Sequence, residues 1–210
     1  SLFPRELTET WHLLYDFGHP FPEHFADFLG VTRASSSDAL FTWAHRTNAL
    51  PLITAGQQPV FADTTNTLRA LAATGFNPAQ VVYLPSPRAG DFQSPSGPNV
   101  PAGTPARVLS ANWSTHRVEC EVDSPAPTLV VIAQTFYHPW RATVNGQPTE
   151  ILRANHAFQA VPVPAGRSTV RLEYVDRHFQ LGVALSTIGL LVCGVLWWRA
   201  KPTAELITNH

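Results

Sequence analysis

The chain has 210 residues, and 44% of them are hydrophobic, which is ample for a packed core. It carries 14 Lys and Arg against 15 Asp and Glu, so it has no excess of basic residues to follow a phosphate backbone, and no nucleic-acid partner is expected. Charged residues make up only 14%, against about a quarter in ordinary soluble domains. This composition is typical of an exported, β-rich protein.

Two helices are predicted near the N-terminus. Leu7 and Trp11 recur at helical spacing, so we expect an amphipathic helix over residues 5–16. A second, shorter helix is expected over residues 22–29, where Gly30 would end it.

Short strands and a third helix follow. Asp63 is a good N-cap for a helix that has Leu68 and Leu71 on one face and Gly75 as its stop. Segments rich in β-branched and aromatic residues predict strands at residues 31–35, 39–46, 49–55 and 80–84. Residues 1–84 are therefore expected to form the α/β N-terminal part of an extracytoplasmic domain.

The pattern changes after residue 84. Residues 85–105 collect Pro, Ser and Gly without periodicity and are expected to form a loop. Residues 106–176 contain only strand patterns, with a hairpin signal at Asn145-Gly146 and a turn at residues 164–166. Short strands at this spacing predict an antiparallel β-sandwich. The expected fold class is therefore mainly β with some α, followed by one C-terminal transmembrane helix.

Residues 179–198 are predicted to span a membrane. They contain no charge, and twenty residues rising about 1.5 Å each match a hydrocarbon core about 30 Å thick. The alternative is a buried core helix, since Gln180 and Ser186 lower the hydropathy. Arg199 and Lys201 favour a cytoplasmic tail over residues 199–210, which leaves the large domain outside the membrane.

Small residues in this segment suggest that it packs against other helices. Gly182, Gly189 and Gly194 would let a neighbouring helix approach closely, as in a multi-helix bundle. The sequence has no methionine and opens without an apolar signal segment. We therefore expect it to be the C-terminal piece of a longer membrane protein.

Two sets of side chains are candidates for a site. The densest ionisable cluster fits no zinc signature, so no metal site is predicted there; it comprises His12, Asp16, His19, Glu23, His24 and Asp27. Better ligand-binding candidates combine flat aromatic faces with polar groups, which suit sugar rings and lipid-linked headgroups; they are Trp113, Tyr137, His138, Trp140, Arg141, Asn155 and His156.

A structural role is the alternative for these candidates. Trp140, directly before an alternating strand, is typical of a core or sandwich-edge residue, and Asn155-His156 is typical of a turn. No catalytic residue is assigned, because the sequence has neither a Gly-rich phosphate loop between a strand and a helix nor a GxSxG elbow.

The segment from residue 128 to residue 186 resembles the C-terminal end of YfhO-type bacterial membrane proteins. The shared order is a strand, an aromatic turn (here residues 137–140), a short hairpin, a Val-Pro-Ala-Gly turn (residues 163–166), a Tyr-bearing strand and the final membrane helix. Upstream, FLGVTRAS, RTNALPLI and GFNPAQVVYL are also similar to segments of that family. The chain departs from the family pattern at His138, at Asn145 and at Gln159, where Arg is common.

The resemblance implies a function. YfhO-type proteins are similar to GT-C-type glycosyltransferases, which transfer sugars from polyprenyl-phosphate carriers to cell-envelope polymers such as teichoic acids. Their acidic catalytic residues lie in an early outer loop between the first membrane helices, which this sequence lacks. The resemblance therefore implies an accessory or acceptor-recognising part that has no cofactor of its own, within a parent protein that uses a polyprenyl-phosphate-linked sugar.

The same resemblance implies where the protein works and with what. The expected location is the bacterial cytoplasmic membrane, and the expected partners are the lipid bilayer, the other membrane helices of the parent protein and an envelope glycopolymer. Two alternatives stay open. One is a self-standing single-pass protein whose sandwich binds carbohydrate or protein without catalysis, and the other is a hydrolase that uses the His-rich N-terminus.

Overall fold

The computed structural model describes residues 4–15, 20–35, 42–86 and 106–200. Most of the predicted loop at 85–105 and of the predicted tail at 199–210 therefore lies outside the described residues, as do Asp16 and His19. The chain divides into two compact units, residues 1–174 and residues 175–210.

The burial of strand β8 (Thr128–Ile132) explains how the first unit is layered. All five of its residues are buried. Leu129 and Val131 face one hydrophobic cluster, while Val130 and Ile132 face a second cluster on the opposite side of the strand. A continuous apolar run of this kind belongs to a strand that is covered on both faces. Two cores therefore share one sheet.

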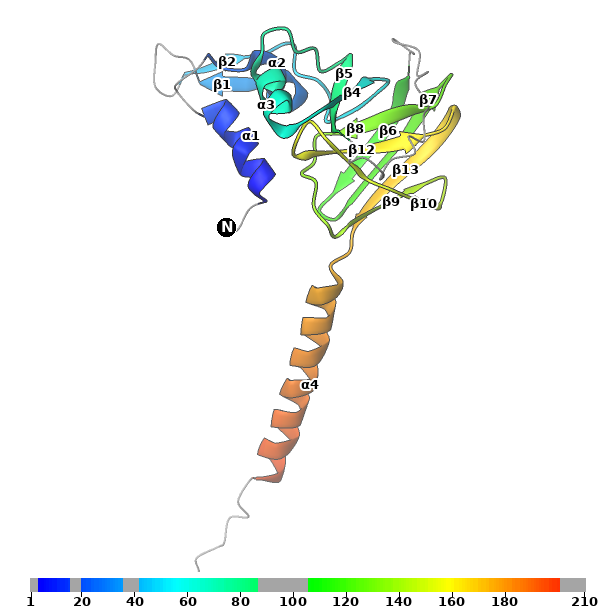
Figure 1. Cartoon of the computed structure of the whole chain (residues 1–210). Helices are drawn as coiled ribbons and strands as arrows, with labels where there is room; N and C mark the ends of the chain where they lie inside the picture. Colours follow the sequence, from blue (N-terminus) through cyan, green and yellow to red (C-terminus); the bar gives the residue numbers. More distant parts are fainter. Residues whose placement is uncertain (1–3, 16–19, 36–41, 87–105, 201–210) are drawn as a thin grey trace, which may run out of the picture. The chain divides into compact units, whose positions relative to one another are not determined.

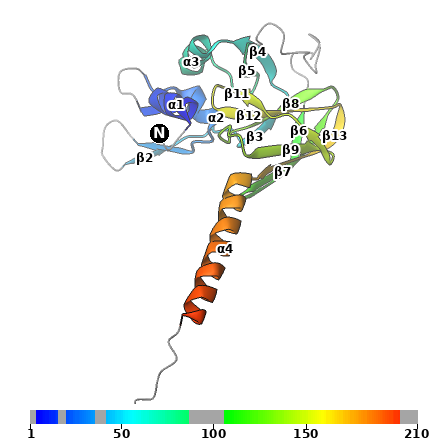
Figure 2. The same ribbon diagram turned by 60° about the horizontal axis from the view of Figure 1, so that its bottom comes forward.

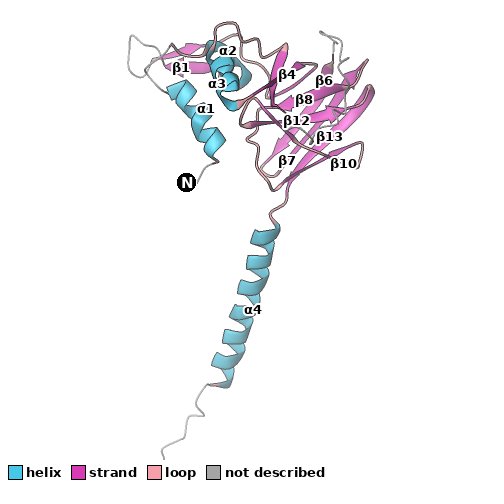
Figure 3. Ribbon diagram, viewed as in Figure 1, coloured by secondary structure: helices cyan, strands magenta, loops and turns pink. Residues whose placement is uncertain are grey.

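That shared sheet has four strands in the order β11-β12-β8-β3, all antiparallel (Figure 2). A five-stranded antiparallel sheet, in the order β10-β9-β13-β7-β6, packs against it through the cluster of Val130 and Ile132. The predicted antiparallel sandwich is confirmed, and Figure 3 shows its strands in magenta. The bounds are β3 Ile53–Ala55, β6 Arg107–Ser114, β7 Arg117–Ser124, β9 Trp140–Val144, β10 Gln147–Thr149, β11 Leu152–Ala154, β12 Phe158–Val163 and β13 Gly166–Tyr174.

The sandwich also takes a strand from the N-terminal part of the chain. Ile53 of β3 pairs with Ile132 of β8 and is 3% exposed, so its side chain belongs to the core between the two sheets. This pairing joins a residue before the predicted loop at 85–105 to the sheet that follows the loop. It makes residues 53–55 an edge of the four-stranded sheet.

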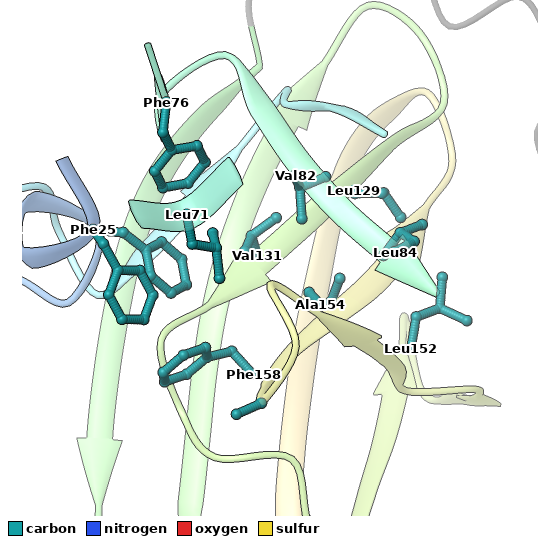
Figure 4. Close-up of a cluster of buried hydrophobic side chains, with 13 residues drawn as sticks. Phe25, Leu71, Phe76, Val82, Leu84, Leu129, Val131, Leu152, Ala154 and Phe158 are labelled. Carbon is teal, nitrogen blue, oxygen red and sulfur yellow. The ribbon is translucent and has the colours of Figure 1, made fainter. Parts of the chain in front are cut away.

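The second core lies on the other face of the shared sheet. Phe25, Leu71 and Val82 pack there against Val131 and Phe158, as Figure 4 shows. These side chains come from helices α2 (Glu23–Phe28) and α3 (Thr64–Ala72) and from strand β5 (Val81–Pro85). Helix α1 (Arg5–Tyr15) and a separate pair of short strands, β1 (Arg33–Ser35) and β2 (Trp43–His45), complete this side (Figure 1).

Strand β4 (Gln58–Ala62), which the sequence pattern did not predict, forms a parallel pair with β5. Pro59 lies inside it, and a proline ordinarily argues against a strand. Helix α3 connects the two strands, and the carboxylate of Asp63 caps it by accepting a hydrogen bond from Asn66 N at 2.8 Å, as predicted. The helix ends at Ala72, earlier than the expected stop at Gly75.

The predicted hairpin is confirmed. Asn145 and Gly146 have φ values of 51° and 80°, the left-handed conformation that a type I′ turn requires at both positions. Because β9 and β10 pair directly on either side, this turn sets their register.

The second unit is dominated by helix α4 (Arg177–Arg199). The Asp176 side chain caps it by accepting a hydrogen bond from Phe179 N at 2.9 Å. Residues 179–199 form a candidate membrane span with a mean hydropathy of 2.1, and none of that stretch is buried within the chain. A buried core helix would be covered by protein, so the structure favours the membrane-spanning alternative. The Thr187 hydroxyl donates to Val183 O at 2.8 Å, which satisfies it inside the helix.

Candidate functional site

Four of the predicted ligand-binding residues lie together. Tyr137, His138 and Trp140, with Tyr174 at the end of β13, form a group that we call the aromatic patch. The Tyr137 and Tyr174 rings stack with centroids 6.5 Å apart, and Trp140 meets Tyr174 edge-on at 5.5 Å. Arg141 is the fourth of the predicted residues found here. Its Nη1 donates to the His138 carbonyl at 2.6 Å, which fixes the turn before β9.

Exposure divides the patch into a supporting part and an accessible part. Trp140 is 7% exposed and belongs to the core between the sheets, as its structural alternative predicted. Tyr137 is 47% exposed and Tyr174 is 36% exposed. Trp113, on edge strand β6, is 37% exposed and sits opposite Val118 in the strand register. The accessible aromatic surface therefore comes mainly from the two tyrosines.

Asn155 has a structural use. It is 1% exposed and has a φ of 44° in the predicted turn between β11 and β12. Its Oδ1 accepts a hydrogen bond from Tyr83 N at 2.9 Å, and its backbone N donates to Tyr83 O at 2.7 Å. One residue thus joins the four-stranded sheet to β5.

His156 also makes a contact between elements. Its Nε2 lies 2.7 Å from Oε2 of Glu9 on α1, and the neighbouring Arg153 reaches Glu6 at 2.8 Å. Burial on its own raises the pKa of Glu9, but the hydrogen bonds from Arg5 and His156 favour the carboxylate and leave that pKa below its ordinary value. The pair attaches α1 to the sandwich. A ligand-binding role for Asn155, His156 and the aromatic residues stays a prediction.

The ionisable cluster at the N-terminus is only partly assembled. His12 is exposed on α1, whereas Glu23, His24 and Asp27 all lie on α2. Arg46, which was not singled out in the sequence, is the centre of this group. Its Nη2 donates to Asp27 Oδ1 at 2.6 Å and to Glu23 O at 2.7 Å, and its Nη1 also contacts the Glu23 carboxylate.

Within this network, the Arg46–Asp27 ion pair is nearly buried. The side chains of Arg46 and Asp27 are 12% and 8% exposed, and burial lowers the pKa of the guanidinium. The Arg46 Nε also donates to Val31 O at 3.1 Å. The network therefore ties α2 to the chain on both sides of the β1–β2 pair.

Beside Asp27 lies a cavity of about 380 Å³, which we call the polar pocket. Its volume falls in the range of small-molecule sites, roughly 300–1,000 Å³. It is formed by α2, the segment before β3 and the turn between α3 and β5, and its lining comprises His24, Asp27, Asn48, Leu50 and residues 74–79. Only His24 and Asp27 had been singled out from the sequence. Apart from Thr74, the remaining lining residues lie in the segments RTNALPLI and GFNPAQVVYL, which were noted for their resemblance to a family and not as parts of a site.

Within the described ranges, no group of three or more His, Cys, Asp or Glu side chains is arranged to hold a metal ion.

The architecture defines the class of protein. A two-sheet β domain continues through Val175 and Asp176 into an apolar helix long enough to cross a bilayer, which is the arrangement of a membrane protein with a folded domain outside the lipid.

A comparison with family models finds a match over part of the chain. The family described as "Bacterial membrane protein YfhO" matches residues 108–186, from strand β6 into the first half of α4. Over this stretch, which is less than half of the chain, the sequence is similar to that family, and the match confirms the resemblance seen in the sequence. No curated protein matches the chain.

Proposed function

We propose that this chain is the extracytoplasmic C-terminal domain and last membrane helix of a YfhO-like glycosyltransferase that uses a polyprenyl-phosphate-linked sugar to modify a cell-envelope polymer. In this proposal the domain recognises the acceptor polymer, and the chemistry takes place in other parts of the enzyme. The donor sugar carrier is a ligand of the parent protein.

One observation carries the proposal. The family match covers strands β6 to β13 of the sandwich and the start of the apolar helix, so the domain and the helix are matched together. A recognition domain attached in this way would stay close to the bilayer, where a polyprenyl-linked donor is held.

The chemistry of the described carboxylates agrees with an accessory role. Transfer of a glycosyl group needs a positioned carboxylate that is able to accept a proton. Asp27, which is buried, is held by Arg46, and Glu9 is held by Arg5 and His156. The hydrogen bonds from Arg5 and His156 lower the pKa of Glu9, so that carboxylate is a weak base and is better suited to support than to catalysis.

Deletion of the gene in the host bacterium tests the proposal. We expect the deleted strain to lose the glycosyl substituent of one envelope polymer, measured by mass spectrometry of purified envelope fractions. A plasmid copy of the intact gene should restore it, whereas a copy lacking residues 106–174 should not. An unchanged sugar content in the deleted strain would count against the proposal.

The second candidate, a non-catalytic carbohydrate-binding domain on a single membrane anchor, is favoured by the exposed aromatic patch. Tyr137 and Tyr174 stack on each other and are 47% and 36% exposed. Aromatic rings of this kind suit the apolar side of a sugar ring. The same deletion distinguishes the two, because a binding protein would leave the glycosylation of every polymer unchanged.

A further inference from the structure

The polar pocket combines two kinds of lining residue. Asp27, His24 and Asn48 contribute polar side chains, while Leu50 contributes a half-buried apolar one. Phe76 also lines the cavity, but it is 3% exposed and belongs to the second core, so it supports the lining from behind. A ligand that fits here needs several hydrogen-bonding groups together with an apolar face.

The polar groups of the pocket are held in place by the fold. Asp27 is fixed by Arg46 at 2.6 Å, and its second carboxylate oxygen lies 3.5 Å from His24 Nδ1. Asn77 accepts a hydrogen bond from Ala79 N at 3.1 Å, which orients its amide in the turn before β5. Carboxylate oxygens accept hydrogen bonds, and amides both donate and accept them, so these groups suit a ligand rich in hydroxyls.

The charge of the lining selects against anions. The carboxylate of Asp27 faces the cavity, and the nearby guanidinium of Arg46 is already engaged by Asp27 and Glu23. His24 is the one basic side chain in the lining, and it sits beside that carboxylate. A phosphate would meet a negative charge without a free cationic partner, whereas a neutral ligand would not.

From this geometry we propose that the polar pocket binds a neutral pyranose unit. Its ring hydroxyls meet Asp27 and the two asparagines, Asn48 and Asn77, and its apolar face lies against Leu50. The identification of this sugar as part of the acceptor polymer rests on the proposed function, while sugar binding itself is a property of the pocket.

Gly75 gives a direct test, because it lines the pocket and a Cβ added there meets nothing within 4 Å. Gly75→Trp fills the cavity, and Gly75→Ala is the matched control that leaves it open. We would record saturation-transfer difference NMR on the full chain in detergent micelles. The probes are methyl α-glucoside, methyl α-galactoside and N-acetylglucosamine, with glucose 6-phosphate as the anionic comparison.

We expect at least one neutral pyranose to bind with a dissociation constant of about 1 mM, as the efficiency of small polar ligands allows. Gly75→Ala should bind within about twofold of the wild type, and Gly75→Trp at least about tenfold more weakly. Should Gly75→Trp fail to fold by circular dichroism, Asn48→Leu replaces it, since Asn48 is exposed and removing its amide should weaken binding in the same direction.

Three results would overturn the inference: no saturation transfer to any neutral pyranose, preferential binding of glucose 6-phosphate, or unchanged binding by the folded pocket variants. These results are separable from a failure of the proposed function. If the chain binds a pyranose but the deleted strain keeps its normal glycosylation, only the proposed function fails. If the deleted strain loses glycosylation but the chain binds no pyranose, only the pocket inference fails.

Discussion

Asn155 serves two structural requirements at once. It adopts a left-handed backbone conformation that asparagine tolerates better than most residues, and it supplies the acceptor for the amide of Tyr83. The second requirement is specific to its side chain, since glycine meets only the first.

Substitutions at Asn155 should therefore separate backbone strain from the hydrogen bond. Asn155→Gly keeps the turn but leaves the Tyr83 amide without its acceptor, which we expect to lower the free energy of unfolding by about 1–3 kcal/mol. Asn155→Asp keeps an acceptor oxygen and should cost less. Urea denaturation of the full chain followed by tryptophan fluorescence measures both. Equal losses for the two variants would show that the side-chain hydrogen bond contributes little.

Arg46 should be among the most sensitive polar residues of the first unit. Arg46→Gln leaves the Asp27 carboxylate buried without its cation, which typically costs about 3–5 kcal/mol. Arg69→Gln is the matched control, because Arg69 is exposed on α3 and its Nη1 donates to Asn66 Oδ1 at 3.0 Å without a buried carboxylate partner among the described residues. Thermal unfolding of the two variants provides the comparison. A loss for Arg46→Gln no larger than that for Arg69→Gln would contradict this view of the network.

Cys120 gives a prediction for alkaline pH. Burial, aided by the neighbouring charge of Glu119, raises the pKa of its thiol from 9.0 to about 11. An unfolded thiol ionises from about pH 9, whereas the folded one stays protonated, so the free energy of unfolding should fall as the pH rises from 9 to 11. Cys120→Val should show a smaller fall over that window in chemical denaturation. Identical slopes would contradict the raised pKa.

At the scale of elements, β3 is the segment that makes the N-terminal part of the chain necessary to the sandwich. Its three residues pair with β8, and the Ile53 side chain fills the core between the sheets. This dependence joins segments nearly eighty residues apart in sequence.

Ile53→Ala should therefore destabilise the sandwich as a whole. Removing a buried isoleucine side chain of this kind costs about 2–5 kcal/mol. Leu52→Ala is the control, because Leu52 is the adjacent residue and is 41% exposed; a surface change of this sort stays within about 0.5 kcal/mol. Hydrogen exchange of the β8 amides reports the effect locally. Unchanged protection of β8 in Ile53→Ala would mean that β3 is not integral to the sheet.

Helix α4 exposes apolar side chains along its length. Leu190, Leu191 and Val195 are between 50% and 74% exposed, and added Cβ atoms at Gly182, Gly189 and Gly194 would meet nothing within 4 Å. Lipid tails satisfy such a surface. The contact with further membrane helices, expected from the small residues, stays a prediction.

For the whole molecule, the orientation of the membrane helix is a prediction that labelling can check. We expect Thr65→Cys on α3 to react with a membrane-impermeant maleimide in intact spheroplasts, and Thr203→Cys in the tail to react only after permeabilisation. Both are placed in a Cys193→Ala background. The remaining thiol, Cys120, is 1% exposed and protonated near neutral pH, so it should not contribute to labelling. The reverse pattern of labelling would place the domain in the cytoplasm.

The sequence alone predicted those features that depend on neighbouring residues. Asp63 as an N-cap, Asn145-Gly146 as a hairpin turn, the alternating strands after residue 106 and the uncharged stretch at 179–198 each follow from local stereochemistry or from continuous hydropathy. Strand β4 was missed because Pro59 lies inside it and its burial does not alternate, and its partner β5 lies about twenty residues further along the chain.

The tertiary structure decided what depends on residues that are distant in sequence. It placed β3 beside β8, joined Asn155 to Tyr83, and enclosed Asp27 with Arg46 and the turn at residues 74–79. It also gave Asn155 and His156 contacts to β5 and α1, although the sequence had grouped them with the aromatic residues by chemistry. Local patterns reflect the preferences of adjacent residues, whereas a pocket forms when segments that are distant in the sequence are brought together by burial of the apolar surface behind them.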